Sequence, residues 1–240
     1  MSETLSNIVR SKDRVAVMAA LHVDVIADFV CPFCFLGKRR LDEALKAVQG
    51  PFDVSWSPFQ LNPDIPPEGQ PFDVYLTRRF GSPANVEPVL EHLAEEGKAS
   101  GVQFRFDRIA HVPSTLPIHQ LMQHAGTLGA DQVALADHLM SAFFEDGSNI
   151  GERGVLIDIA SAHGISPKET GEAIGNDRIR QIVATREARA RSSGLLGAPG
   201  FLINRRLLVV GAQPADALIG AFDRGMFGEG LDSLVSPAVH

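Results

Sequence analysis

The chain contains two cysteines, which stand three positions apart in the segment Cys31-Pro32-Phe33-Cys34. A disulfide between such close residues closes a very short loop and adds little stability, so the pair is suited to reactivity or to metal binding. A structural zinc site needs four ligands, and the sequence has no second Cys-X-X-Cys and no compact histidine pair beside the cysteines. We therefore expect thiol–disulfide chemistry at Cys31 and Cys34, with no metal and no resident cofactor.

The cysteines stand between a predicted strand and a predicted helix. Residues 22–29 alternate between apolar and polar side chains, which is typical of a strand. Beyond the cysteines, apolar residues recur at helical spacing until Gly50-Pro51 ends the helix, namely Leu41, Ala44, Leu45 and Val48. The predicted helix thus begins at the cysteines.

The start of a helix favours thiol chemistry. The sulfur of Cys31 would meet free backbone N–H groups and the positive end of the helix dipole, both of which stabilise a thiolate. The thiolate is the nucleophile in disulfide exchange, and Pro32 suits the first turn because its missing N–H costs no hydrogen bond there. Cys34, one turn further in, is expected to be more buried and to attack a mixed disulfide on Cys31.

The rest of the chain predicts an α/β fold with a large helical stretch in its middle. Residues 52–58 alternate again and indicate a second strand, and the proline-rich residues 62–69 indicate a linker. Apolar stripes then predict several helices, the last of which carries alternating Arg and Glu over 178–191 and is interpreted as a solvated face. Two short apolar runs, 200–203 and 207–210, predict a hairpin before a final helix.

Two halves that are each too small to stand alone should join into one sheet. We therefore divide the chain into an N-terminal extension (1–21), a first strand-helix-strand part (22–61), a helical insertion (62–193) and a second part with the hairpin and last helix (194–240).

Composition limits the partners. The 240 residues carry 22 basic and 29 acidic side chains, a formal net charge of −7, which argues against nucleic acid or an anionic membrane as the main partner. No stretch approaches the roughly 18 apolar residues that span a bilayer. The short apolar run 15–21 follows three basic residues but leads straight into the first strand, so we interpret it as an extension of the domain or as residues ahead of a true start at Met18, and not as a signal peptide. A cytoplasmic location is expected.

The cysteine segment resembles a known family. The run from Asp28 to Leu41, DFVCPFCFLGKRRL, resembles the active-site segment of the FrnE branch of DsbA-like thioredoxin-fold proteins. The likeness continues in the same order through Asn62-Pro63, Phe143-Phe144, Asn149-Ile150, Gly197-Ala198-Pro199 and Gly211-Ala212-Gln213-Pro214. The resemblance implies a thioredoxin-like fold interrupted by a helical insertion domain. It also implies a relationship to 2-hydroxychromene-2-carboxylate isomerases and kappa-class glutathione transferases.

The resemblance also implies where a substrate binds. Ala198-Pro199 would be the cis-proline bond of thioredoxin folds, packed against the cysteines and presenting backbone groups to a disulfide-linked peptide, while Pro32 and Phe33 border the same surface. Phe33 stands where the branch usually has tryptophan and DsbA has histidine. Because phenylalanine donates no hydrogen bond to a thiolate, we predict a less oxidising pair than that of DsbA. Ala198 is smaller than the branched residue usual at its position, which would widen the groove beside Cys31.

Other candidate residues carry weaker signals. Asp28, three residues before Cys31, is either a proton acceptor for Cys34 or an exposed strand residue. His119 lies one position beyond an apolar helical stripe, where a surface or satisfied core histidine is commoner than a catalyst. Asn62, Ala198 and Gln213 stand where the family resemblance would place the backbone of glutathione.

Three functions remain open on the sequence. The leading one is dithiol–disulfide exchange with a disulfide-containing protein or a small thiol. We expect it to run in the reducing or isomerising direction, because the redox potential of the cytosol keeps most such cysteine pairs reduced. The second is a glutathione-dependent isomerase or transferase with glutathione as co-substrate, against which the intact cysteine pair counts. The third is a non-catalytic chaperone or assembly partner that uses a groove in the helical domain.

Overall fold

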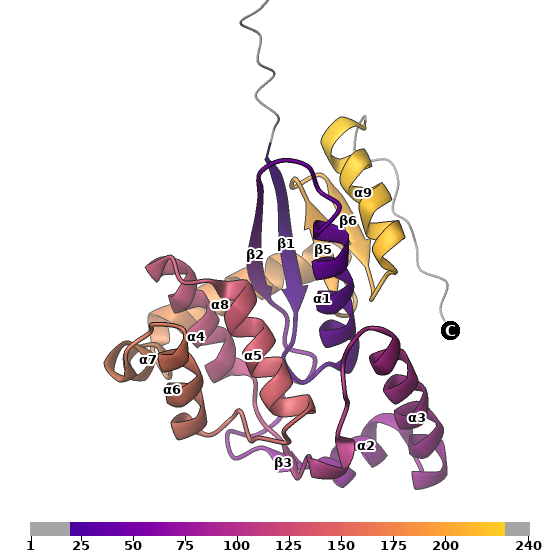
Figure 1. Cartoon of the computed structure of the whole chain (residues 1–240). Coiled ribbons are helices and arrows are strands. Elements are labelled where there is room, and N and C mark those ends of the chain that lie inside the picture. The colour runs from indigo at the N-terminus through magenta and orange to yellow at the C-terminus, as the bar shows by residue number, and fades with distance from the viewer. Residues whose placement is uncertain (1–19, 229–240) are drawn as a thin grey trace, which may run out of the picture.

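Segments from both ends of the chain meet in one four-stranded sheet. The computed structural model describes residues 20–228 (Figure 1). The strand order is β2-β1-β5-β6, with bounds β1 Leu21–Ala27, β2 Phe52–Pro58, β5 Gly200–Ile203 and β6 Leu207–Val210. β1 runs parallel to β2 and antiparallel to β5, and β5 and β6 form the expected antiparallel hairpin. The register pairs Val23 with both Val54 and Ile203.

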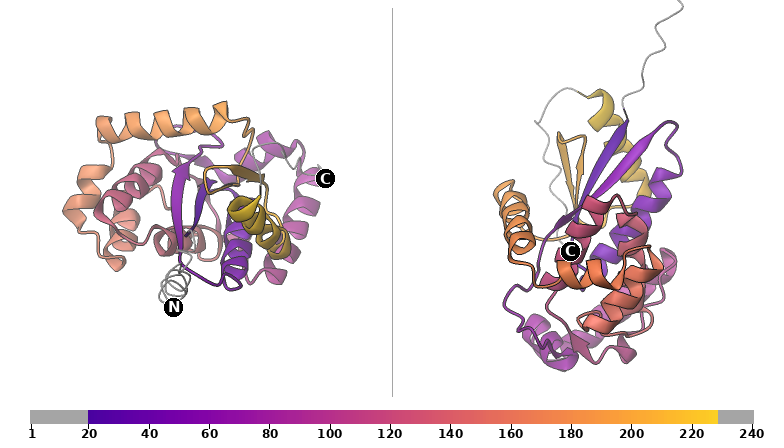
Figure 2. Two further views of the ribbon diagram at one scale, coloured as in Figure 1. Left: turned by 90° about the horizontal axis from the view of Figure 1, so that it is seen from above. Right: turned by 90° about the vertical axis from the view of Figure 1, so that its left-hand side faces the viewer.

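Helices cover both faces of this sheet. Seen from above, α1 (Pro32–Leu45) and α9 (Ala215–Phe227) lie side by side on one face, and α8 (Asp177–Ser192) runs along the other (Figure 2). α1 begins with Pro32 in its first turn, as the sequence predicted. The arrangement is a thioredoxin-like fold with its two parts drawn from distant stretches of the sequence.

The intervening residues form a mostly helical unit below the sheet (Figure 1). A small antiparallel pair, β3 (Gln70–Pro71) and β4 (His111–Val112), closes its base. Its other elements are α2 (Phe72–Phe80), α3 (Pro83–Ala99), a 3₁₀ turn (Phe106–Arg108), α4 (Leu116–Leu128), α5 (Gln132–Phe144), α6 (Arg153–Ala162) and α7 (Pro167–Ala173). Local capping fixes several of these helix ends: the Asp131 carboxylate accepts hydrogen bonds from two backbone N–H groups at the start of α5, and Ser166 forms a capping box at the start of α7.

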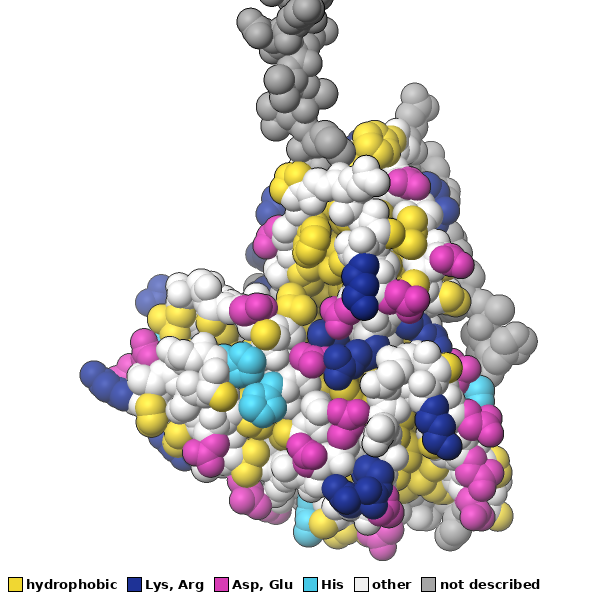
Figure 3. All heavy atoms as spheres, viewed as in Figure 1, with side chains coloured by type: hydrophobic (Ala, Val, Ile, Leu, Met, Phe, Trp, Pro, Cys, Tyr) yellow, Lys and Arg dark blue, Asp and Glu magenta, His cyan; other side chains and the backbone are white. Residues whose placement is uncertain are grey.

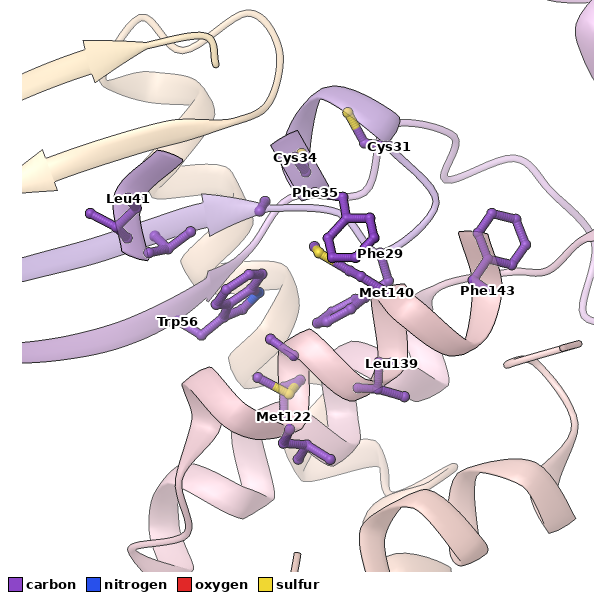
Figure 4. Close-up of a cluster of buried hydrophobic side chains, with 14 of the residues drawn as sticks. Phe29, Cys31, Cys34, Phe35, Leu41, Trp56, Met122, Leu139, Met140 and Phe143 are labelled. Carbon is purple, nitrogen blue, oxygen red and sulfur yellow. The ribbon is translucent and has the colours of Figure 1, made fainter. Parts of the chain in front are cut away.

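One hydrophobic core runs from the sheet into the helical unit. Phe35 of α1 stacks on Phe144 of α5 with ring centroids 5.9 Å apart, and Phe104 meets both rings edge-on. Figure 4 shows how the cluster continues through Phe29 and Met140 to Trp56 on β2. Because α1 contributes to this cluster, the helix that begins at the cysteines is fixed by packing from the sheet side and from the inserted helices.

The structure corrects some of the predicted boundaries. β1 begins at Leu21, inside the predicted extension, and ends at Ala27, so Asp28 and Phe29 lie beyond the strand. α1 ends at Leu45, so Val48 is not part of it. Residues 62–69 contain neither helix nor strand, as the linker prediction required. Residues 1–19 of the predicted N-terminal extension lie outside the described residues.

The prediction that 178–191 is a solvated face is wrong on one side of α8. Arg186 donates hydrogen bonds to the backbone oxygen of Trp56 at 3.0 Å and to the hydroxyl of Ser57 at 2.8 Å, and the Glu187 side chain is buried against Gln60. These side chains tie α8 to the end of β2. Tertiary contacts of this kind leave no local sequence signal.

The surface carries mixed charge. Basic and acidic side chains are interspersed over the face shown in Figure 3, with no broad field of one sign. None of the described helices is long and apolar enough to cross a bilayer.

Candidate redox site

The two cysteines lie at the first turn of α1. Cys31 occupies the N-cap position with an extended backbone, and the N–H groups of Cys34 and Phe35 donate to its carbonyl oxygen. Figure 4 shows the Cys31 sulfur turned away from the hydrophobic cluster, with Cys34 one turn along the helix. The pair thus lies at the positive end of the α1 dipole, as predicted. Both residues are buried, Cys31 at 3% and Cys34 at 1% exposed, so the expected difference in burial is small.

The loop before β5 lies directly against Cys31. The Ala198–Pro199 peptide bond is cis, which confirms the expectation from the family resemblance. The Cys31 sulfur lies 3.7 Å from the carbonyl oxygen of Ala198. Gly37 of α1 permits this approach, since a Cβ atom there would come within 3.0 Å of the Pro199 ring. A disulfide attacked by Cys31 would therefore meet the backbone of this loop.

Cys34 is held as a neutral thiol behind Cys31. The backbone N–H of Asp28 points at its sulfur at 3.5 Å. Burial raises the pKa of the Cys34 thiol well above its ordinary value, and the neighbouring Cys31 raises it further. Cys34 must therefore lose a proton before it can attack a mixed disulfide on Cys31.

Asp28 is fully buried, so the alternative of an exposed strand residue is wrong. Its carboxylate accepts hydrogen bonds from the N–H groups of Phe29 (2.9 Å) and Leu61 (2.7 Å) and faces Nε2 of His119 at 3.2 Å. His119 is itself buried, packs on the Phe29 ring, and has no hydrogen-bond partner for Nδ1 among the described residues. A carboxylate–imidazole pair thus lies beneath the cysteines. The histidine comes from α4, 91 residues away in sequence, so no local pattern could have linked it to Asp28.

Two large apolar side chains close in sequence to the contact between Cys31 and Ala198 are exposed. Phe33, between the cysteines, is 45% exposed, and Leu196, two residues before Ala198, is 94% exposed. An exposed aromatic ring at the position of Phe33 is suited to contact an apolar segment of a substrate.

Of the residues predicted to hold glutathione, the structure brings two near different parts of the site and engages the third elsewhere. Ala198 faces Cys31, and Asn62 lies beside Tyr75 of α2 with its amide nitrogen buried. The Gln213 side chain donates to the carbonyl oxygen of Val210 at 2.8 Å, so it serves the turn after β6. Tyr75 was not identified from the sequence. It is the one tyrosine of the chain.

Metal ligation finds no support in the described residues. Between residues 20 and 228, no three His, Cys, Asp or Glu side chains converge in a way that could hold an ion.

The chain is similar to known proteins over most of its length. A model of the DSBA-like thioredoxin domain matches residues 22–223. The chain is 28% identical over 145 residues to the uncharacterised protein YwbO of Bacillus subtilis (strain 168), covering 60% of this chain and 67% of that protein. A crystal structure of a probable DsbA oxidoreductase from Streptomyces coelicolor superposes with a TM-score of 0.79 at 26% identity, covering 90% of this chain and 94% of that one.

More distant structures share the fold. The cytosolic disulfide reductase DsbM from Pseudomonas aeruginosa, solved with glutathione, has a TM-score of 0.58 at 20% identity, covering 85% of this chain and 95% of that one. A 2-hydroxychromene-2-carboxylate isomerase has a TM-score of 0.61 at 13% identity, with the same two coverages. Since the family match extends over most of the chain and agrees with the thioredoxin-like sheet described above, this chain belongs to the DSBA-like thioredoxin domain family.

Proposed function

We propose that this chain is a dithiol–disulfide oxidoreductase that exchanges disulfides with proteins or small thiols through Cys31 and Cys34. The observation that carries the proposal is the placement of Cys31 at the start of α1, against the carbonyl oxygen of Ala198, with the protonated Cys34 one turn behind it. In this placement Cys31 is the attacking thiol, and Cys34 supplies the second thiol from one turn along the helix.

The exchange proceeds in two displacements. In the reducing direction, the Cys31 thiolate attacks one sulfur of the substrate disulfide, forms a mixed disulfide and releases the other sulfur as a thiolate that takes up a proton. Cys34 then loses its proton and attacks the Cys31 sulfur, which closes the Cys31–Cys34 disulfide and releases the second substrate thiol. Two electrons pass from the protein to the substrate, and a small thiol such as glutathione returns them.

We further propose that the protein acts in the cytoplasm and that it reduces substrate disulfides. DsbM, a cytosolic disulfide reductase, shares the fold, and cytosolic poise keeps most such pairs reduced. Phe33 between the cysteines cannot donate a hydrogen bond to the Cys31 thiolate. We therefore place the reduction potential below the roughly −120 mV of DsbA.

Insulin reduction with glutathione as the electron source tests the proposal, together with the reduction potential of the pair in a glutathione buffer. Cys31→Ser should abolish insulin reduction. Cys34→Ser should accumulate a mixed disulfide with the substrate, visible as an added mass on the intact protein. The proposal fails if Cys31→Ser keeps its activity or if wild-type protein forms no intramolecular disulfide.

The isomerase alternative has a fold relative but no supporting feature in the site. The likeness to 2-hydroxychromene-2-carboxylate isomerase at 13% identity concerns the fold, and both cysteines are in place here. That alternative requires glutathione affinity that survives in Cys34→Ser, together with turnover of an aromatic substrate.

A further inference from the structure

A groove of about 640 Å³ runs along the exposed side of α8, where this helix packs against α4. α8 lies at the periphery of the molecule in both views of Figure 2. The side chains that line the groove take no part in the redox site described above. Arginine is the most frequent residue type among them, at positions 178, 186 and 189.

Two of these three arginines carry a positive charge that nothing nearby offsets. Arg178 and Arg189 are exposed and form no ion pair with any of residues 20–228. Arg186 is half-buried, donates to the side chain of Gln123 at 2.7 Å and lies 3.9 Å from the Asp24 carboxylate, which offsets its charge. Among the described residues that line the groove, none is acidic. The groove is therefore positive, although the chain carries a formal net charge of −7.

The two uncompensated charges stand far apart on one side of α8. Arg178 and Arg189 are three helical turns from each other, which places their Cα atoms about 16 Å apart along the helix axis. Ile182 and Thr185 lie between them at helical spacing, and Ile182 is 38% exposed. A single small anion is too short to reach both guanidinium groups. The groove thus presents two separated positive charges with an apolar side chain between them.

This pattern fits an acidic protein segment better than a nucleic acid. Single-stranded nucleic acids stack their bases on aromatic side chains, and the lining has no aromatic residue among the described positions. Duplexes need many phosphate contacts, which two free arginines in an acidic chain do not supply. Guanidinium groups bind carboxylates through paired hydrogen bonds, and the exposed amide of Gln181 is able to bind a peptide group. An extended peptide covers about 16 Å in roughly five residues.

We propose that this groove binds an acidic segment of a partner protein. The segment lies extended along α8, with one carboxylate at Arg178, another at Arg189 and an apolar side chain over Ile182. Because α8 covers the face of the sheet opposite to α1, the bound segment occupies a surface separate from the helix that carries the redox pair. The binding involves no redox step, so it does not depend on the function proposed above.

The test measures the affinity for two short peptides that differ in charge. The acidic probe is the capped heptapeptide Glu-Glu-Gly-Leu-Gly-Glu-Glu, and the neutral probe has Gln in place of every Glu. Isothermal titration calorimetry at low ionic strength gives the dissociation constants for wild type and for an Arg178→Gln, Arg189→Gln double variant. We expect wild type to bind the acidic probe, and both the double variant and the neutral probe to show roughly tenfold weaker binding. Added salt should weaken the wild-type complex.

Arg180→Gln is the matched control. It removes an exposed arginine from the same helix, but Arg180 pairs with Asp177 at 3.6 Å and does not line the groove, so the affinity should stay within about twofold of wild type. Arg178→Lys with Arg189→Lys keeps both charges and should recover part of the affinity. Circular dichroism confirms that each variant is folded.

Three results would overturn the proposal. The first is equal affinity of wild type for the acidic and the neutral probe, and the second is an equal loss of affinity in Arg180→Gln and in the double variant. The third is tighter binding of a single-stranded oligouridylate than of the acidic probe, which would assign the groove to nucleic acid. Each of these results leaves the oxidoreductase function untouched, because insulin reduction and the reduction potential are measured separately.

Discussion

At the scale of single residues, the enclosed thiol of Cys34 links the redox state of the protein to its stability. Burial raises the pKa of this thiol well above its ordinary value, so the folded protein keeps a proton that the unfolded chain releases above about pH 8.5–9. The contribution of the Cys34 thiol to the free energy of unfolding is therefore fully present below that pH range. It is lost as the pH rises toward the pKa of the thiol in the folded protein.

We predict that the free energy of unfolding of the reduced protein falls by up to about 1.4 kcal/mol per pH unit from this group alone as the pH rises from 9 to 10. Urea denaturation across this pH range measures the slope. Cys34→Ala should remove this contribution, as should oxidation of the pair. Tyr75, whose pKa is also raised by burial, adds a similar contribution only above pH 10. Identical slopes for wild type and Cys34→Ala would contradict the prediction.

We propose that Asp28 assists the ionisation of Cys34. Its backbone N–H points at the Cys34 sulfur while its carboxylate faces His119, so this buried pair is the acceptor that we propose for the thiol proton. We predict that Asp28→Asn slows the resolution of a Cys31 mixed disulfide about 10²-fold near pH 7 and much less at high pH, where hydroxide removes the proton.

Stopped-flow measurement of the second displacement over a range of pH tests this role of Asp28, with the rate of the first displacement as internal control. A rate loss that is the same at every pH would show that Asp28 acts by holding Leu61 and Cys34 in position and not as a proton acceptor.

At the scale of elements, α8 fixes the end of the edge strand β2 and the segment that leads to the site. Arg186 donates to Trp56 and Ser57, while Arg191 donates to the carbonyl oxygen of Gln60 at 2.6 Å and lies over the Phe59 ring. The next residue is Leu61, which holds the Asp28 carboxylate. The helix thus supports the segment that holds the Asp28 carboxylate.

We predict that Arg186→Ala lowers the free energy of unfolding by about 2–3 kcal/mol, because a half-buried carbonyl oxygen and the Ser57 hydroxyl both lose a charged donor. Arg189→Ala, an exposed position on the same helix, is the matched control and should stay within about 0.5 kcal/mol of wild type. Chemical denaturation of both variants gives the comparison. Equal effects at the two positions would mean that the contacts of Arg186 add no stability.

At the scale of the whole molecule, the parts that could be predicted are those with local signals. Strand alternation and helical spacing predicted β1, α1, β2 and the β5–β6 hairpin, and the same patterns placed the cysteines at a helix start. The orientation of Arg186 toward β2 and the meeting of Asp28 with His119 depend on how elements pack, and residues 91 positions apart leave no shared pattern. The cis bond at Ala198–Pro199 was expected because of the family resemblance, since no local rule distinguishes it from a trans bond.

The sheet order has a consequence for how the protein is made. Val23 pairs with Ile203, and the loop against Cys31 ends at Pro199, so β5 and this loop are translated long after the cysteines. At about 5–20 residues per second, a ribosome needs roughly 10–30 seconds to add the intervening stretch. For the greater part of its synthesis, a nascent chain therefore carries both thiols without the loop that later packs against Cys31. During this time the thiols are open to the reductants around the ribosome, before the folded site exists.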